Sequence, residues 1–320
     1  ERVSAAKLSK FDHETALLAL TAIMNQFVVQ LMHSCMGHIE DGDDDDDKKR
    51  DEHTKGNYTN SAEAKHASEK ALVGYCAFHH LLLYLTLKYP KMKRIAEEKL
   101  GRFINDEAHR HKMHTPDLGK LLLNLVICYK YSWDDLKESF IKEGNIRNIK
   151  WALQKYPDLE YMDTDKCPDN YRIESMLKST TVSRRLIAFQ IWFIQNIARP
   201  SEVTSRKELL LSYNRRWGRP TNRQKASLMK VVKEVLAPEP DYRHTQWIRY
   251  FESVGIGGEF KSKQDVLNYL RANVEESRRR SYHRANGKAL RENRMYSMKC
   301  KFNVKQEMYQ RTYITPRTCT

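Results

Sequence analysis

The chain has 320 residues, of which 40% are hydrophobic, and its 56 Lys and Arg against 41 Asp and Glu give a formal net charge of +15. This apolar content suffices to bury a core, and the length fits one large domain or two domains of about 150 residues each. No stretch is apolar for long enough to cross a bilayer, and residues 1–15 lack the apolar run of a signal peptide. We therefore expect no membrane association and no secretion.

The six cysteines are scattered singly, without any Cys-x-x-Cys pair. This pattern is typical of reduced thiols in a cytoplasmic or nuclear protein and not of a disulfide framework. Charge is distributed unevenly, because residues 1–170 hold 25 Lys and Arg against 28 Asp and Glu, whereas residues 171–320 hold 31 against 13. Such an asymmetry favours contact with an acidic partner, such as nucleic acid, anionic lipid or an acidic protein face.

Apolar residues recur at three- and four-residue spacing through residues 1–157, which predicts an N-terminal helical half. A charged run that includes Asp43–Asp47 separates the first two helices. Adjacent carboxylates repel one another and bury nothing, so residues 38–60 are predicted to form a disordered acidic loop. A calcium site is the weaker interpretation, because calcium loops alternate their oxygen ligands and need a placed glycine. Helices are expected at residues 7–36, 61–88, 92–104, 115–128, 133–141 and 145–155.

The most apolar segment of this half extends from Leu121 to Cys128 and contains no charged residue. Before it, Thr115 suits a helix cap, Pro116 the first helical position and Asp117 the positive end of the helix dipole. These features predict a central helix that is buried on every face. The core residues expected from this half are Leu118, Leu122, Leu125 and Trp133.

The segment 158–170 is the most loop-like connection and the predicted boundary between two helical halves, which the sequence leaves free to pack as one body. Residues 171–277 form the second half, with Trp192 and Trp247 as expected core residues. No repeat of constant length recurs, so an irregular multi-helix bundle and an imperfect helical solenoid both fit an all-α fold. From residue 278 to residue 320 the periodicity is lost, which predicts a basic, poorly ordered tail.

No catalytic motif is present, since the chain lacks the nucleophile elbow, the phosphate loop and the dinucleotide-binding fingerprint. His109, His111 and His114 are the best candidates for metal ligands. No thiolate or carboxylate lies at a matching spacing, and a basic loop is the simpler interpretation. We therefore predict no catalytic residue, no metal, no cofactor and no small-molecule ligand.

Two basic segments remain as candidates for a binding surface. Residues 278–284 read RRRSYHR, a run that suits phosphate contacts or a nuclear-import signal as well as a solubilising tail. Residues 215–220 read RRWGRP, for which a helix C-terminus stabilised by cations is the preferred interpretation. The predicted anion or nucleic-acid contacts are Arg278, Arg279, Arg280, Arg284, Lys288, Arg291 and Arg294.

Several short sequence segments occur together in this chain: residues 25–32 (NQFVVQLM), 75–83 (YCAFHHLLL), 115–122 (TPDLGKLL), Trp133 and residues 215–220 (RRWGRP). In these segments the chain resembles a helical region of large eukaryotic proteins that also carry a ubiquitin-conjugating-enzyme-like domain. The likeness covers most of residues 15–283 and implies a companion scaffold in a ubiquitin-related protein. None of the nine prolines follows a histidine, so the His-Pro-Asn signature of the conjugating domain is absent from this chain and no catalytic cysteine is carried over.

The sequence thus predicts a non-enzymatic helical scaffold or protein-interaction module that serves a protein partner, accessory to a ubiquitin-conjugating domain. The alternative is a helical protein that binds nucleic acid through its basic second half and tail.

Overall fold

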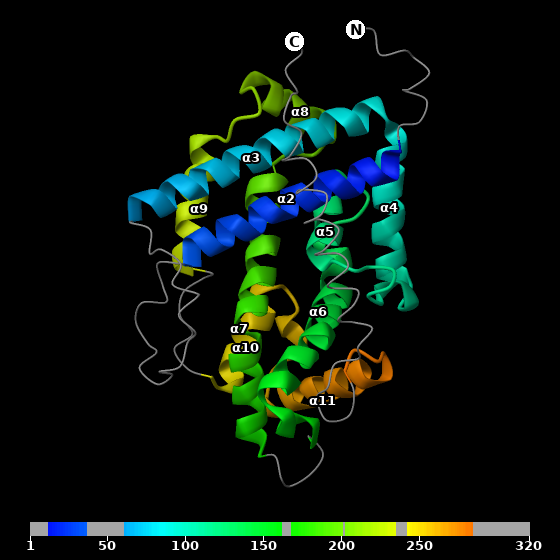
Figure 1. The fold of residues 1–320 in the computed structure, drawn as a ribbon, viewed down its shortest axis with the longest axis vertical. Coiled ribbons are helices and arrows are strands. Elements are labelled where there is room, and N and C mark those ends of the chain that lie inside the picture. The colour runs from blue at the N-terminus through cyan, green and yellow to red at the C-terminus, as the bar shows by residue number, and fades with distance from the viewer. Residues whose placement is uncertain (1–11, 37–60, 162–167, 201, 235–241, 284–320) are drawn as a thin grey trace, which may run out of the picture.

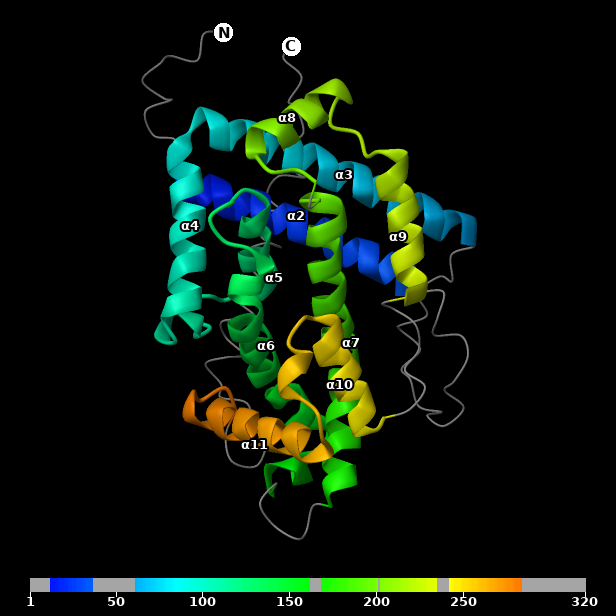
Figure 2. The same cartoon turned by 180° about the vertical axis from the view of Figure 1, so that it is seen from behind.

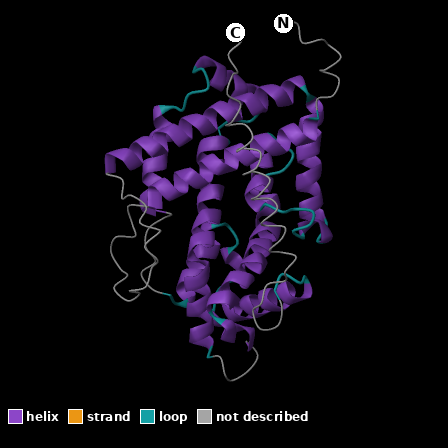
Figure 3. Ribbon diagram, in the orientation of Figure 1, coloured by secondary structure: helices purple, strands orange, loops and turns teal. Residues whose placement is uncertain are grey.

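The structure, a computed structural model, describes residues 12–36, 61–161, 168–200, 202–234 and 242–283 (Figure 1). Within these ranges the chain forms ten α-helices and no strand, which confirms the predicted all-α, multi-helix fold (Figure 3). The predicted acidic loop at 38–60 and residues 284–320 of the predicted tail lie outside the described residues.

The helices follow one another with short connections, several of which contain a turn of 3-10 helix. The α-helices are α2 (His13–Met36), α3 (Ser61–Lys88), α4 (Pro90–Asn105), α5 (Leu118–Leu122), α6 (Trp133–Lys155), α7 (Asp169–Phe193), α8 (Arg206–Arg215), α9 (Asn222–Glu234), α10 (His244–Ser253) and α11 (Lys263–Arg279). The shorter elements are η2 (Ala108–Arg110), η3 (Leu123–Val126), η4 (Pro157–Tyr161), the π-helical turn η5 (Ile194–Ala198) and η6 (Gly257–Glu259).

Helices α2 and α3 lie side by side and antiparallel, and both cross the upper half of the molecule (Figures 1 and 2). Their direction follows from two ring contacts, His13 with Tyr89 at 5.4 Å and Phe27 with Phe78 at 5.9 Å between centroids. Helices α6 and α7 run at a steep angle to this pair, and α11 crosses below them (Figure 1). The helices do not stack as repeated pairs, so the arrangement is a bundle and not a solenoid.

By length and composition alone, two segments of this pair are apolar enough to cross a membrane, His13–Ser34 in α2 and Ser68–Lys88 in α3. No such segment was expected from the sequence, because polar residues interrupt each apolar run. The structure buries 39% of the most apolar window of the first and 44% of the second against other helices. Core helices of a folded domain meet the same criterion, so this finding assigns no membrane role.

The predicted central helix is shorter than expected and begins later. Helix α5 covers only Leu118–Leu122 and continues as the 3-10 turn η3. Asp117 is the cap, since its carboxylate accepts a hydrogen bond from the Lys120 N–H at 3.1 Å. The Thr115 hydroxyl instead donates to the His109 carbonyl oxygen at 2.8 Å, and the helix begins three residues later, at Leu118. Burial of the segment nevertheless agrees with the sequence, because every residue from Leu121 to Cys128 is buried.

Gly119 lets α2 and α7 approach α5 closely. A Cβ atom at this position would lie 2.5 Å from Asn25 Oδ1 and 2.6 Å from Gln190 Nε2. These two amides are joined to each other, because Gln190 Nε2 donates to Asn25 Oδ1 at 2.9 Å. A side chain at residue 119 would therefore have to break this bridge between helices of the two halves.

Replacing Gly119 with alanine is expected to lower the free energy of unfolding by about 1–3 kcal/mol, the usual cost of overpacking. Helix propensity alone would favour alanine by about 1 kcal/mol, so the sign of the effect separates the two causes. Urea unfolding followed by circular dichroism measures it. An alanine variant as stable as the wild type would show that the Asn25–Gln190 hydrogen bond can be displaced at little cost in free energy.

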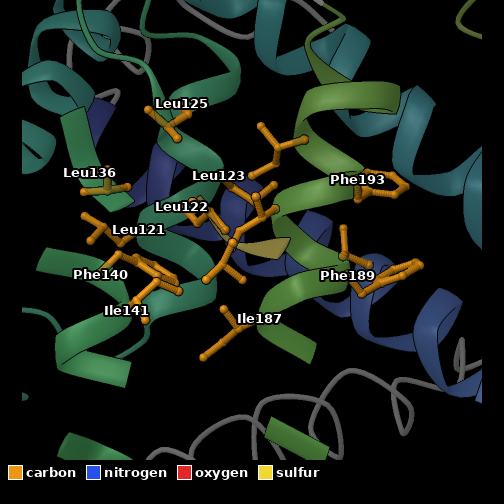
Figure 4. Packing of buried hydrophobic residues seen from close by; sticks show 14 of the residues in the cluster. Leu121, Leu122, Leu123, Leu125, Leu136, Phe140, Ile141, Ile187, Phe189 and Phe193 are labelled. Carbon is orange, nitrogen blue, oxygen red and sulfur yellow. The ribbon is translucent and has the colours of Figure 1, made fainter. Parts of the chain in front are cut away.

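One hydrophobic core joins the two predicted halves. Figure 4 shows leucines of the α5–η3 segment between side chains of α6, such as Phe140, and side chains of α7, such as Phe189. Of the residues expected in the core, Leu122, Leu125 and Trp247 are at most 2% exposed, and Leu118, Trp133 and Trp192 are partly buried against the same cluster. The Trp133 indole N–H also donates to the Val254 carbonyl oxygen at 3.1 Å, which ties α6 to the end of α10.

Helix α6 is continuous from Trp133 to Lys155, whereas the sequence predicted two helices with a break before Asn145. Gly144 causes no break because it is buried against α7, where a Cβ atom would lie 3.0 Å from Ile187 Cδ1. Close helix packing therefore explains this glycine better than a turn does.

Candidate protein-interaction surface

Helix α8 ends in a backbone turn that carries the most exposed large hydrophobic side chain of the described residues. The Ser205 hydroxyl caps the start of the helix by accepting the Glu208 N–H at 3.2 Å. At the other end the Gly218 N–H donates to the Tyr213 carbonyl oxygen at 3.0 Å and the Trp217 N–H donates to that of Asn214 at 3.2 Å. This pair of hydrogen bonds is the Schellman motif, which normally places glycine where Trp217 stands.

Trp217 adopts a left-handed backbone conformation with a φ of 54°, and 89% of its surface is exposed. The equivalent position after α10 holds Gly255 with a φ of 86°, and after α11 it holds Ser281 with a φ of 56°. A left-handed conformation costs a residue with a Cβ atom about 1–2 kcal/mol relative to glycine. The fold thus accepts strain at Trp217 while gaining little burial, and such unexplained outliers concentrate at functional sites.

Buried aromatic and imidazole groups fix this turn to α3. His79, which is fully buried, has its Nδ1 atom 3.1 Å from the Tyr213 hydroxyl. His80 stacks on the Tyr213 ring at 5.7 Å between centroids, and its Nε2 atom lies 2.7 Å from Asn214 Oδ1. The Arg216 guanidinium covers the same tyrosine ring at 4.2 Å. The base of the turn is therefore rigid, and it presents Trp217 in a preorganised position.

Burial lowers the pKa of His79 to about 3, with the nearby positive charge of Arg216 as a second cause. A histidine that is neutral in the folded state binds its proton more readily when the chain unfolds. Its contribution to stability is therefore complete above pH 6.5 and is lost as the pH falls toward 3.

We expect the free energy of unfolding to fall by about 2 kcal/mol per such histidine between pH 7 and pH 5. Urea unfolding at both pH values, for the wild type and for His79→Gln, isolates the contribution of His79 from those of the other titrating groups. The glutamine variant should lose less stability than the wild type over this interval. Equal losses in the two proteins would mean that His79 is accessible to protons in the folded state.

The outer face of α3 adds an apolar stripe between α2 and the Trp217 turn. Gly218 marks its border on the α8 side, since a Cβ atom there would lie 3.0 Å from His80 Nδ1. Ala77 lies on this face and is exposed. The larger apolar side chains of the same face are each 38–51% exposed. These larger side chains are Val73, Leu81, Tyr84 and Leu87.

The charges around this surface are mostly positive, since the exposed Glu69, one turn before Val73, is paired with Lys225 at 3.6 Å. No Asp, Glu, Lys or Arg occurs in α3 between residues 71 and 87, and Lys88 ends the helix. Arg215 and Arg219 flank Trp217, and both are exposed. Among the described residues, neither of these arginines has an ion-pair partner. We call the exposed stripe of α3 together with Trp217, Arg215 and Arg219 the Trp217 surface.

The structure gives the predicted anion-contact residues different roles. Arg278 is exposed at the end of α11. Arg279 is largely exposed, but it pairs with Glu276 at 2.7 Å and with Glu107 at 3.2 Å. Arg284, Lys288, Arg291 and Arg294 lie outside the described residues.

Arg280 belongs to the folded body and not to a tail, because its side chain is only 7% exposed. It donates to Glu143 Oε2 at 2.6 Å, pairs with Glu107 at 2.9 Å and also contacts Glu276. Hydrogen bonds from Arg279 and Arg280 lower the pKa of Glu276 to about 2. The predicted tail boundary at residue 278 is therefore too early, since Tyr282 and His283 are buried as well.

Glu143 is the centre of this ion-pair cluster and is 1% exposed. Its carboxylate accepts hydrogen bonds from Arg147 Nε at 2.6 Å and from the Tyr282 hydroxyl at 3.0 Å, in addition to that from Arg280. Arg147 in turn donates to the carbonyl oxygens of Arg110 and Thr115, each at 2.7 Å. The cluster therefore joins α6, the end of α11 and the loop before α5.

The three histidines considered as metal ligands point to different neighbours. His109 lies 2.6 Å from Asp106 and its ring packs against that of His114, whereas His111 packs against the Tyr282 ring. Among the residues that the structure describes, no group of three or more metal-ligating side chains is placed to hold an ion.

A cavity of about 250 Å³ lies between α2, α4 and the loop that carries His109 and His114. Two of its cations are already paired, Lys99 with Glu14 at 2.9 Å and Lys120 with Asp117 at 3.8 Å. Arg102 also lines the cavity and has no ion pair among the described residues, so the cavity holds one unpaired guanidinium and no cluster of them.

Comparison with known proteins adds no further constraint. No protein-family model matches the chain, and neither a curated protein nor a solved structure matches it.

The segment RRWGRP stood out in the sequence as basic, but the exposure and the left-handed backbone of Trp217 were not predicted. Reading residues 215–220 as a helix C-terminus agrees with the end of α8 at Arg215. The remaining signal was the order Trp-Gly at a helix end, which places a bulky residue where glycine is preferred. Its exposure could not be read from the sequence, because an aromatic residue beside arginines also occurs at buried helix ends.

Proposed function

We propose that this chain is a non-enzymatic, helical protein-interaction module that binds its partner through the Trp217 surface. The observation that carries this proposal is a tryptophan held in a strained backbone conformation with 89% of its surface exposed. Tryptophan and arginine are the residues most enriched among the side chains that dominate binding energy at protein interfaces. Tyr84 and the leucines of α3 supply an apolar area beside them.

A role beside a ubiquitin-conjugating domain is the finer part of the proposal. It is supported by the resemblance of residues 75–83 and 215–220 to the helical region of proteins that carry such a domain. These same segments contribute Ala77, His80 and Leu81 of α3 and the whole Trp217 turn. The segments that carry the resemblance therefore contribute part of the surface that we propose to bind a partner.

The experiment selects ligands from a displayed library of protein fragments, taken from the cell that makes this chain, and includes ubiquitin-conjugating domains as separate ligands. Wild-type protein serves as bait and the Trp217→Gly variant as counter-bait. We expect bound fragments to lose at least tenfold in affinity for the variant, as measured by titration calorimetry. Trp151, which is 59% exposed on α6, provides the matched control as Trp151→Ala, and this change should leave affinity unaltered.

The glycine variant separates binding from folding. Removing the strain at residue 217 offsets the greater freedom of glycine in the unfolded chain, so we expect the free energy of unfolding to change by less than about 1 kcal/mol. Loss of binding would then report a lost contact. Fragments that bind both proteins equally would contradict the proposal, and nucleic-acid binding that falls steeply with salt would favour the alternative function.

A further inference from the structure

We infer that the partner presents an amphipathic α-helix with carboxylates along one edge, which lies along α3 beside Trp217. This inference rests on the proposed function and names the kind of partner that its surface fits. Three observations carry it: the spacing of the exposed residues, the absence of sheet edges among the described helices, and the one-sided distribution of charge.

The exposed positions of α3 follow a straight line along the helix. Residues 73, 77, 81, 84 and 87 are separated by four, four, three and three positions, so their side chains lie on one face of the helix and form an exposed seam. His80 borders this seam and is covered in part by the Tyr213 ring. The seam is about 21 Å long at 1.5 Å per residue, so a partner helix of about 14–18 residues would match it.

A helix is favoured over an extended segment because the surface is built from helices. Backbone N–H and C=O groups in the interior of α3 and α8 already bond within their own helices. An extended peptide laid on this uncharged stripe would find no strand edge to pair with, and its own backbone groups would lose water without compensation. A helical segment satisfies its backbone internally and only has to bury side chains.

Charge determines which helix fits. The turn on the α8 side carries the exposed Arg215 and Arg219 on either side of Trp217, whereas α2 holds no Asp, Glu, Lys or Arg from Thr15 to His33. The complementary helix therefore carries Glu or Asp along the edge that faces Trp217 and uncharged residues along the edge that faces α2. A second copy of this chain is a poor occupant, because it would bring the same arginines to the surface of a protein with a net charge of +15.

The test uses two synthetic 18-residue helices with leucine at the seam positions, labelled with a fluorophore. One carries glutamate and the other lysine along a single edge. We expect the glutamate helix to bind at least tenfold more tightly than the lysine helix by fluorescence anisotropy. The double variant Arg215→Glu/Arg219→Glu should reverse this preference, and Trp217→Gly should weaken the glutamate helix about 30-fold. Arg278→Glu, in the last turn of α11, which Figure 1 shows well away from α8, is the control and should change nothing.

Equal binding of the two helices, or a preference that the charge reversal leaves unchanged, would overturn the inference. So would a wild-type dimer in sedimentation that Trp217→Gly dissociates, or Trp217-dependent binding to phosphatidylcholine vesicles, since these identify a second copy or a lipid surface as the occupant. Failure of the inference is distinguishable from failure of the proposed function. Library fragments that depend on Trp217 but are neither acidic nor helical would refute only the inference, whereas the absence of any Trp217-dependent ligand would refute both.

Discussion

Replacing Leu122 with aspartate is expected to unfold the whole protein. Leu122 is 1% exposed and lies among side chains of α6 and α7 (Figure 4). A carboxylate there would be charged without a partner, or would take up a proton at a cost that rivals the total stability of a typical domain, about 5–15 kcal/mol. Because one core joins both halves, the loss should reach residues 171–277 and not only the first half.

Circular dichroism at 222 nm and the thermal transition measure this effect. Leu122→Ala should retain the fold with a loss of about 2–5 kcal/mol, as expected for a truncated core leucine. Leu211→Asp places the same charge on the exposed face of α8, where the leucine is 49% exposed, and should leave the fold intact. A Leu122→Asp protein with native ellipticity and a cooperative transition would show that the α5–η3 segment is not the centre of the core.

Replacing Glu143 with glutamine is expected to lower the free energy of unfolding by about 3–5 kcal/mol, the usual effect of removing one partner from a buried ion pair. The amide keeps the volume of the side chain but leaves Arg147 and Arg280 buried without their shared countercharge. Arg147 also holds the carbonyl oxygens of Arg110 and Thr115, so the loop before α5 should loosen first. Hydrogen exchange of the amides of residues 110–116 would report this change.

Glu174→Gln is the matched control for that experiment. Glu174 pairs with Lys178 at 2.7 Å on the surface of α7, with both side chains at least 40% exposed. Exposed pairs of this kind contribute about 0–1 kcal/mol, so the control should be nearly as stable as the wild type. Similar losses in the two variants would mean that the Glu143 cluster is open to solvent.

The sequence predicted helices well where apolar residues recurred without interruption, and less well where helices begin or end. Helix α3 was predicted at its observed limits, because its long apolar pattern ends before Pro90. The predicted start of α5 was wrong because Thr115 and Asp117 can each cap a helix; the Thr115 hydroxyl bonds to the His109 carbonyl oxygen, and Asp117 is the cap. The break in α6 was wrong because Gly144 serves helix packing.

The candidate site was harder to predict for a physical reason. Arg280 belongs to a run of three arginines, and a local run gives no sign that Glu143 of α6 and Glu107 before η2 converge on it, beside Glu276 of its own helix. The same holds for Trp217, whose exposure depends on the packing of α8 against α3. Long-range contacts therefore decide which basic residues are internal and which can meet a partner.

In the turn after α8, selection for folding and selection for binding favour different residues at position 217. Folding alone would favour glycine at position 217, so a lineage that no longer used the surface would be free to lose the tryptophan by drift. Gly119, in contrast, should persist in any descendant that keeps the helix packing, whatever it binds. Among related sequences, the joint retention of Trp217, Arg215 and Arg219 would therefore record the presence of a partner independently of any measurement on the protein itself.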